Sequence, residues 1–247
     1  MAEPEFARRA RSFGPAAELY DRARPSYPDE AISWMLGEAP LQVVDLGAGT
    51  GIFSRAVAGL GHDVTAVDHD AEMLRRLAAA TEGVRALEGA AEAIPLRDAS
   101  ADAVVAAQAF HWFDNDEARA EIARVLRPGG VFAPIWNIRD ESVAWVATLS
   151  TIVPAGAGAS ASAHVLPGRG FGPLFSRPER AEFRHAVRHT ADSLVRLVES
   201  RSMYLVADDV ERSRIEGQVR ELVGGLPQPF ELPYVTVAFR AYAVATG

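Results

Sequence analysis

Short runs of apolar and β-branched residues alternate with helical patterns through the first part of the chain. We expect strands at residues 41–46, 62–67, 84–89, 101–108 and 130–137. The segment "AEMLRRLAAA" from Ala71 has apolar residues at helical spacing, and Asp70 is placed to cap it. A second helix, "DEARAEIARVLRPGG", should end at Pro128, Gly129 and Gly130. Strands that alternate with helices at this spacing predict a parallel sheet with helices on both faces.

The chain after residue 140 follows a different pattern. Residues 154–173 are rich in Gly, Ala, Ser and Pro, which predicts either a linker or a lid over a site. Helical patterns follow at 191–205 and 208–225, and strand patterns at 181–190 and 234–244 bracket them. The apolar face expected on the second helix consists of Ile215, Val219, Leu222 and Val223.

Composition narrows the class of protein. A chain of 247 residues with 49% hydrophobic content can form one large α/β domain or two small ones. No apolar run approaches the roughly 18 residues of a membrane span, and the N-terminus lacks the apolar region of a secretory signal. We therefore expect a cytoplasmic protein with no membrane partner. The chain has no cysteine, which excludes disulfides, thiolate metal sites and a cysteine nucleophile.

The charged residues limit the classes of partner and of catalytic chemistry that we expect. A net charge of −8 argues against a nucleic-acid partner, because nucleic-acid affinity comes mainly from neutralised phosphates. All 25 basic side chains are arginine, which excludes lysine Schiff bases and a P-loop lysine. We expect no metal site.

The most informative motif is a glycine-rich loop in "VVDLGAGTGIFSRAV". A predicted strand ends at Leu46, glycines follow at Gly47, Gly49 and Gly51, and a helix begins near Ile52. Glycines allow a sharp turn and let a ligand approach the backbone closely, and a helix N-terminus offers free N–H groups. The carboxyl end of the first strand is where open α/β sheets bind ligands.

Three acidic residues accompany this loop. Asp45 lies two residues before the first glycine, where it could hold the loop amides or accept a hydrogen bond from a ligand ammonium. Asp68 closes the second strand, 21 residues after Gly47, where a carboxylate binds ribose hydroxyls. Glu92 follows the third strand, near the expected edge of an adenine. A nicotinamide-dependent oxidoreductase is the alternative, but the loop lacks the G-x-G-x-x-G spacing, and Asp45 would repel a pyrophosphate.

These residues are similar to those of class I S-adenosylmethionine-dependent methyltransferases, in particular the methyltransferase type 11 group, over residues 40–137. "RVLRPGG" before the fifth strand is a further hallmark of that family. The segment "YDRARPSYPDEAI" resembles a subgroup that includes trans-aconitate methyltransferases. The resemblance implies an α/β, Rossmann-like mixed sheet of seven strands in the order 3-2-1-4-5-7-6, with the last strand antiparallel and helices on both faces.

We expect one methyltransferase domain over residues 1–247. Its parts are an N-terminal lid or helical segment at 1–39, a cofactor-binding core at 40–137, and acceptor-side helices with the last two strands at 138–247. By the resemblance, S-adenosylmethionine is the cofactor and S-adenosylhomocysteine its product. The adenine contact comes from either the Ala91 backbone or Glu92. The implied cofactor site comprises Tyr20, Asp45, Gly47, Ala48, Gly49, Gly51, Asp68, His69, Met73, Ala91, Glu92, Gln108 and Ala109.

The segment after the fourth strand should border the same crevice, because that strand lies beside the first in this fold. His111 is the candidate catalytic base for a hydroxyl or carbon acceptor, since an imidazole titrates near pH 6.5. Its alternative is a packed histidine ahead of a helix that Asp114 caps. Arg24 could grip a substrate carboxylate or lie on the surface. The predicted substrate-binding residues are Arg24, Tyr27, His111 and Trp112.

The expected function is S-adenosylmethionine-dependent methylation of a small molecule, at the oxygen of a carboxylate or hydroxyl. "QAFH" replaces the Asn/Asp-Pro-Pro-aromatic motif that enzymes methylating amide or base nitrogens often carry, which argues against a nucleobase acceptor. Besides an oxidoreductase, a non-catalytic S-adenosylmethionine-binding protein is an alternative. We expect a monomer or homodimer, and the identity of the acceptor is left open.

Overall fold

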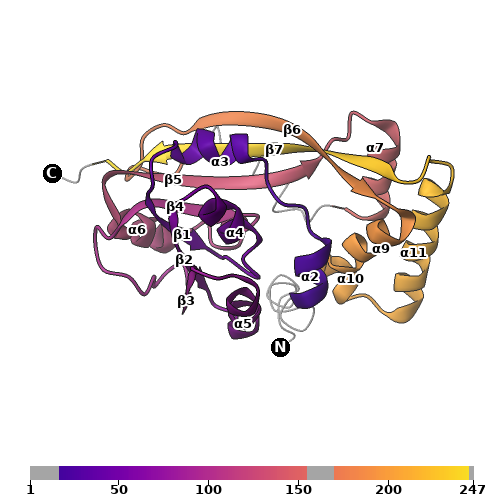
Figure 1. Ribbon diagram of the computed structural model, residues 1–247, viewed down its shortest axis with the longest axis horizontal. Helices are drawn as coiled ribbons and strands as arrows, with labels where there is room; N and C mark the ends of the chain where they lie inside the picture. The colour runs from indigo at the N-terminus through magenta and orange to yellow at the C-terminus, as the bar shows by residue number, and fades with distance from the viewer. Residues whose placement is uncertain (1–16, 155–169, 245–247) are drawn as a thin grey trace.

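The computed structural model describes residues 17–154 and 170–244, so most of the predicted linker or lid at 154–173 lies outside the described residues. The elements are shown in Figure 1. They are α2 (Ala17–Ala23), α3 (Asp29–Leu36), β1 (Gln42–Leu46), α4 (Ile52–Gly59), β2 (Asp63–Asp68), α5 (Ala71–Ala80), β3 (Arg85–Glu88), β4 (Ala101–Ala107), the 3₁₀ helix η2 (Phe110–Trp112), α6 (Asp116–Val125), β5 (Leu126–Arg139), α7 (Ala144–Ile152), β6 (Glu179–His189), α9 (Ala191–Glu199), α10 (Ser202–Leu205), α11 (Asp209–Gly224) and β7 (Phe230–Tyr242).

The strands form one seven-stranded sheet in the order β3-β2-β1-β4-β5-β7-β6. Strands β1 to β5 pair in parallel, and β7 runs antiparallel to both of its neighbours. The expected strand order, the antiparallel last strand and the Rossmann-like fold are therefore confirmed. Because β1, β2 and β4 end at the same edge of the sheet, the loops that follow them lie close together.

Both faces of the central strands β1 and β4 are buried, which explains why these strands are apolar without alternation, whereas the edge strand β6 alternates exposed and partly buried residues. Val43 and Val105 pack in one core cluster, with the helices α3 and α4. Val44 and Val104 pack in the other, together with the ring of Phe132. A ligand can therefore enter the sheet region only at its edges and ends.

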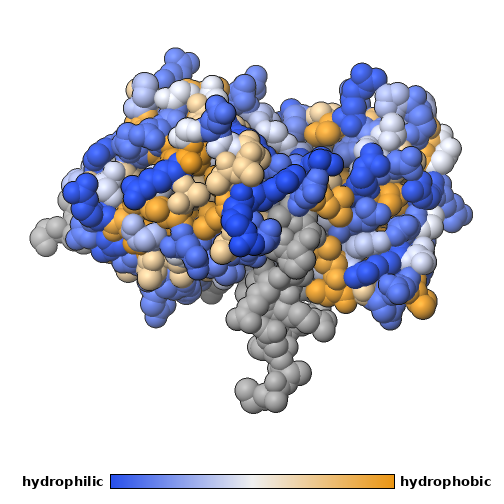
Figure 2. Space-filling view, turned by 60° about the horizontal axis from the view of Figure 1, so that its bottom comes forward, coloured by the Kyte–Doolittle hydropathy of each residue, from blue (hydrophilic) through white to orange (hydrophobic). Residues whose placement is uncertain are grey.

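A third core cluster joins α7, α9 and α11 to the ends of β6 and β7. Figure 1 shows these helices gathered with α10 at one end of the long strands. The helix α2 contacts both α5 and α9, so it bridges the glycine-loop half and this helical end. Figure 2 shows a face covered largely by hydrophilic residues, with hydrophobic residues in separate patches. No helix within 17–154 or 170–244 is long and apolar enough to span a bilayer.

Local signals at helix ends were partly confirmed. Asp70 caps α5, as expected, by accepting hydrogen bonds from the backbone of its first turn. The expectation that Asp114 caps α6 is wrong: Asn115 is the cap and accepts from Ala118 N at 2.8 Å. Asp114 pairs instead with the guanidinium of Arg119. Both residues are good cap formers, and the chain direction leaving η2 decides between them.

Two predicted helix bounds were also wrong. α6 ends at Val125, ahead of the predicted stop at Pro128, because the residue before a proline disfavours helical backbone. The single helix expected at 191–205 is broken between α9 and α10, where Arg201 is extended, with φ −84° and ψ 139°. The break leaves the backbone carbonyl of Ser200 available, and Arg24 donates to it at 3.1 Å.

Candidate active site

The glycine loop has the backbone conformation that its sequence predicts. Gly47, Gly49 and Gly51 have φ values of 73°, 55° and 81°, in the left-handed region that favours glycine. A Cβ atom on Gly47 would lie 2.7 Å from Cβ of Ala109, and one on Gly51 would lie 2.6 Å from Cγ of Leu77. The loop therefore needs glycine both for its turns and for its close packing.

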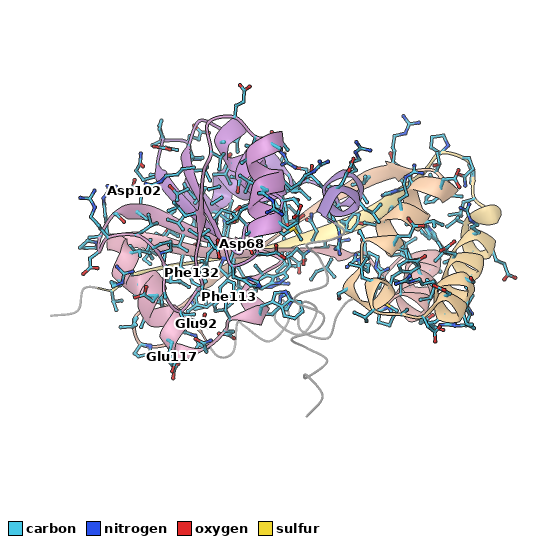
Figure 3. All side chains as sticks on the ribbon, turned by 90° about the horizontal axis from the view of Figure 1, so that it is seen from below. Asp68, Glu92, Asp102, Phe113, Glu117 and Phe132 are labelled. Carbon is cyan, nitrogen blue, oxygen red and sulfur yellow. The ribbon has the colours of Figure 1, made fainter. Side chains whose placement is uncertain are left out.

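A cavity of about 410 Å³ opens beside this loop, at the carboxyl ends of β1, β2 and β4. Figure 3 shows Asp68, Glu92 and Phe113 in this part of the molecule, whereas Asp102, at the start of β4, lies away from them. We call this the main cavity. Its lining consists of Leu46, Gly47, Gly49, Asp68, His69, Asp70, Met73, Gly89, Ala90, Ala91, Glu92, Ala107, Gln108, Ala109, Trp112 and Phe113.

Asp68 lies where β2 meets the main cavity, and its side chain is largely buried. Its carboxylate accepts hydrogen bonds from Gly49 N at 2.8 Å and from Asp70 N at 2.9 Å. The exposed His69 places Nδ1 3.4 Å from the same carboxylate. Each carboxylate oxygen has a second lone pair. Asp68 can therefore hold the glycine loop and still accept from ribose hydroxyls.

Asp45 is fully buried behind the loop. Its Oδ2 accepts from Ser54 Oγ at 2.6 Å, and its Oδ1 has no hydrogen-bond partner. Burial raises the pKa of Asp45 to about 7, with the hydrogen bond from Ser54 opposing the rise and the charge of Asp68 adding to it. Asp45 was expected either to hold the loop amides or to accept from a ligand ammonium. It is Asp68, and not Asp45, that accepts from the loop amide of Gly49. The unpartnered oxygen fits a ligand ammonium.

A second, smaller cavity of about 60 Å³ lies on the other side of the glycine loop. It shares Gly47, Gly49, Ala107 and Gln108 with the main cavity. The lining of this second cavity consists of Arg24, Pro25, Tyr27, Asp45, Gly47, Ala48, Gly49, Thr50, Ile52, Phe53, Ala107, Gln108, Asn137, Arg201 and Tyr234. A ligand that occupies both cavities must pass the glycine loop and Gln108.

Gln108 stands at this boundary with an uncommon backbone conformation. Its φ is 55°, which non-glycine residues rarely adopt and which occurs mostly at functional sites. Its backbone N donates to Ile135 O at 2.9 Å, and its side-chain Nε2 donates to Asn137 O at 2.8 Å. The end of β5 therefore holds Gln108 between the cavities.

Two of the three candidate site residues from the N-terminal segment line the second cavity. Arg24 donates to Ser200 through Nε, at 3.0 Å from Oγ, and it lines the second cavity. Tyr27 is buried against Phe53, with ring centroids 4.8 Å apart, and lines the same cavity. Tyr20 lies on α2, but its side chain falls outside the described residues.

His111 is not brought to either cavity. Its Nδ1 faces Trp136 Nε1 at 3.4 Å, and its ring lies against Trp112. Burial lowers the pKa of His111 to about 4, which leaves the imidazole neutral and weakly basic. The catalytic role of His111 stays a prediction, and this geometry gives it no support. Gly51 also lines neither cavity, since it packs against α5.

Among the lining residues of the second cavity that were not predicted are Asn137, Arg201 and Tyr234. Asn137 follows an apolar strand just as Gln108 does, so the same argument could have found it. No sequence pattern near Arg201 or Tyr234 indicates a functional site. Arg201 lies inside a helical pattern, and Tyr234 lies inside a strand pattern. Over 17–154 and 170–244, no group of three or more His, Cys, Asp or Glu side chains could hold a metal ion.

Comparisons with known proteins identify the family of the chain. Residues 44–133 match the family described as "Methyltransferase domain". An uncharacterized methyltransferase of Mycobacterium tuberculosis is 42% identical over 235 residues, covering 93% of this chain and 95% of the relative. A malonyl-[acyl-carrier protein] O-methyltransferase of Pectobacterium atrosepticum is 39% identical over 128 residues, about half of each chain.

Solved structures agree as well. A structure described as that of a candidate type II methyltransferase from Anaeromyxobacter dehalogenans has a TM-score of 0.62 and 26% identity, covering 91% of this chain and 99% of the other. The trans-aconitate subgroup stays a prediction. These matches favour the methyltransferase interpretation over the oxidoreductase and the non-catalytic binding protein. The chain belongs to the methyltransferase family and is an S-adenosylmethionine-dependent enzyme.

Proposed function

We propose that this methyltransferase acts on an oxygen of a small molecule, with an ionised carboxylate as the leading acceptor. The observation that carries the proposal is the second cavity, where Arg24 and Arg201 line the space next to the glycine loop. Arginine recognises carboxylates with paired, charge-assisted hydrogen bonds. His111, the predicted base, lies outside this space.

The residues around the main cavity fit S-adenosylmethionine. Asp68 would accept from the ribose hydroxyls. The unpartnered, buried Oδ1 of Asp45, which lines the adjoining second cavity, would accept from the ammonium group. Glu92 and the backbone at Ala91 border the space expected for the adenine. The absence of a side chain at Gly49, where no atom lies within 4 Å of a Cβ position, leaves room for close approach to the loop.

A carboxylate acceptor is consistent with this arrangement of side chains. The bound cofactor supplies a methyl group on a positively charged sulfur, so attack by a carboxylate oxygen forms a C–O bond, breaks an S–C bond and gives a neutral ester and thioether. A carboxylic acid is already ionised at neutral pH, so no general base has to remove a proton. The protein then contributes chiefly by aligning the reactants.

The Pectobacterium relative is named for O-methylation, which supports oxygen as the acceptor atom. The test is a panel of small carboxylic acids, alcohols and amines incubated with the enzyme and S-adenosylmethionine. We expect release of S-adenosylhomocysteine, with methyl esters detected by mass spectrometry. The primary amides of the same acids are the matched controls and should give no product. Methylation of amines or alcohols without any ester would contradict the carboxylate assignment.

A further inference from the structure

Tyr234 carries a buried hydroxyl group with no hydrogen-bond partner. The residue lies on β7, is 1% exposed and lines the second cavity. Its ring stacks on His185, with centroids 5.4 Å apart at 26°. A buried hydroxyl left unpaired costs free energy, because it has lost its hydrogen bonds to water. An unpaired donor in the wall of a cavity is a feature that a ligand acceptor atom would satisfy.

Three guanidinium groups act on this hydroxyl through their charge, and those of Arg24 and Arg201 line the same cavity. Burial raises the pKa of Tyr234, whereas the positive charges of Arg201, Arg139 and Arg24 lower it, so all three arginines act on the phenol. Arg139 is 6% exposed and donates to the backbone carbonyl of Val153. Among residues 17–154 and 170–244, no carboxylate lies within ion-pair distance of Arg139. Burial lowers the pKa of Arg139, the charges of Tyr234 and Glu141 oppose that change, and the like charge of Arg24 adds to it.

Positive charges that lie near one another repel, and an anion placed among them would relieve that repulsion. The charges come from three separate parts of the chain: Arg24 from the link between α2 and α3, Arg139 from the end of β5, and Arg201 from the break between α9 and α10. Tertiary structure thus brings Arg24, Arg201 and the unpaired donor of Tyr234 into the lining of the second cavity, which Arg139 does not line.

We infer that Tyr234 Oη, with Arg201 and Arg24 beside it, forms a carboxylate-binding subsite for the methyl acceptor. This inference rests on the proposed function and adds the residues that select the substrate. Tyr234 and all three arginines lie outside residues 44–133, the part that matches the methyltransferase family. The cofactor's amino-acid end also has a carboxylate. The proposed function assigns the ammonium of that end to Asp45, which also lines the second cavity, so the experiment below measures cofactor affinity and acid binding separately.

The test uses Tyr234→Phe and Arg201→Gln in the full-length protein saturated with S-adenosylhomocysteine. Matched controls are Tyr242→Phe, at the other end of β7, and Arg85→Gln, on exposed β3. The probes are formate, acetate, malonate and benzoate, with acetamide, malonamide and benzamide as neutral counterparts, titrated by calorimetry. We expect the acids to bind and the amides not to bind. Tyr234→Phe and Arg201→Gln should each weaken acid binding by roughly tenfold or more, and the controls should match the wild type.

Further readouts separate this subsite from packing and from the cofactor. Without ligand, Tyr234→Phe should melt at or above the wild-type temperature, because it removes an unpaired buried hydroxyl. Its affinity for S-adenosylhomocysteine should be unchanged. Wild-type protein that binds none of the acids, or a variant that binds them equally well, would overturn the inference. An equal loss of S-adenosylhomocysteine affinity would also overturn it, by assigning the subsite to the cofactor.

The same variants distinguish the two proposals. If carboxylates bind in a Tyr234-dependent manner but the methyl group goes to a hydroxyl or an amine of the acceptor, the subsite stands and the carboxylate-methylation proposal fails. If methyl esters form equally fast in wild type and in Tyr234→Phe, the proposed function stands and the subsite is wrong.

Discussion

The buried carboxyl group of Asp45 should make cofactor binding depend on pH. Its pKa of about 7, against an ordinary 3.8, is a rise of about 3 units. At about 1.36 kcal/mol per unit, ionising this group in the folded protein costs on the order of 4 kcal/mol more than in water. The cofactor's ammonium should bind only the ionised form. We therefore expect the affinity to fall roughly tenfold from pH 8 to pH 6, and about tenfold more for the next unit.

Replacing Asp45 by Asn keeps the size of the side chain and removes its charge. Asp45→Asn should bind S-adenosylhomocysteine roughly tenfold to a hundredfold more weakly at pH 8, the scale of a charged hydrogen bond. It should lose most of the pH dependence, so that wild type and variant converge near pH 5. Calorimetry from pH 5 to 8.5 measures this directly. A wild-type affinity that does not change with pH, or a slope that persists in Asp45→Asn, would refute the assignment of the ammonium to Asp45.

The stability of the ligand-free protein supplies an independent check. Because the folded-state pKa of Asp45 lies above its unfolded value, the folded protein binds more protons between pH 4 and 7. The free energy of unfolding should therefore decrease as the pH rises through this window. Asp45→Asn should flatten that decrease in urea denaturation, by up to about 4 kcal/mol. An unchanged pH profile of stability would mean that Asp45 titrates near its ordinary value.

Three further substitutions test the rest of the site. Asp68→Ala should weaken cofactor affinity by about 1–3 kcal/mol in calorimetry, and an unchanged Kd in a folded variant would remove Asp68 from the site. Gly47→Ala combines a φ of 73° with a Cβ only 2.7 Å from that of Ala109, so it should lower stability by about 1–3 kcal/mol and abolish measurable cofactor binding. His111→Gln should leave the pH profile of kcat unchanged, since the imidazole faces Trp136 outside both cavities. The loss of the acidic limb from that profile would restore the role of His111 as a base.

The sequence by itself determined the parts of this protein that depend on neighbouring residues. The loop requires glycine because its backbone turns through positive φ values, whatever the rest of the chain does. Asp70 caps α5 by accepting from amides that lie two and three residues away. Asp45 and Asp68 are placed by strands whose ends share one edge of a parallel sheet. The strand order followed from a family resemblance carried by these same motifs. Local patterns were sufficient because backbone conformation and side-chain capping act over a few residues.

Only the tertiary structure decided the acceptor side. Tyr234, Arg24 and Arg201 line one cavity although they come from different parts of the chain. The sequence pointed to Arg24 through its segment, but no local pattern marks Tyr234 or Arg201. The surroundings of His111 include Trp136 on β5, which donates to its Nδ1 from a distant part of the sequence. The burial of a side chain and the charges near it depend on segments that are far away in the sequence. The order of residues along the chain therefore predicts neither the desolvation of a group nor the charges around it.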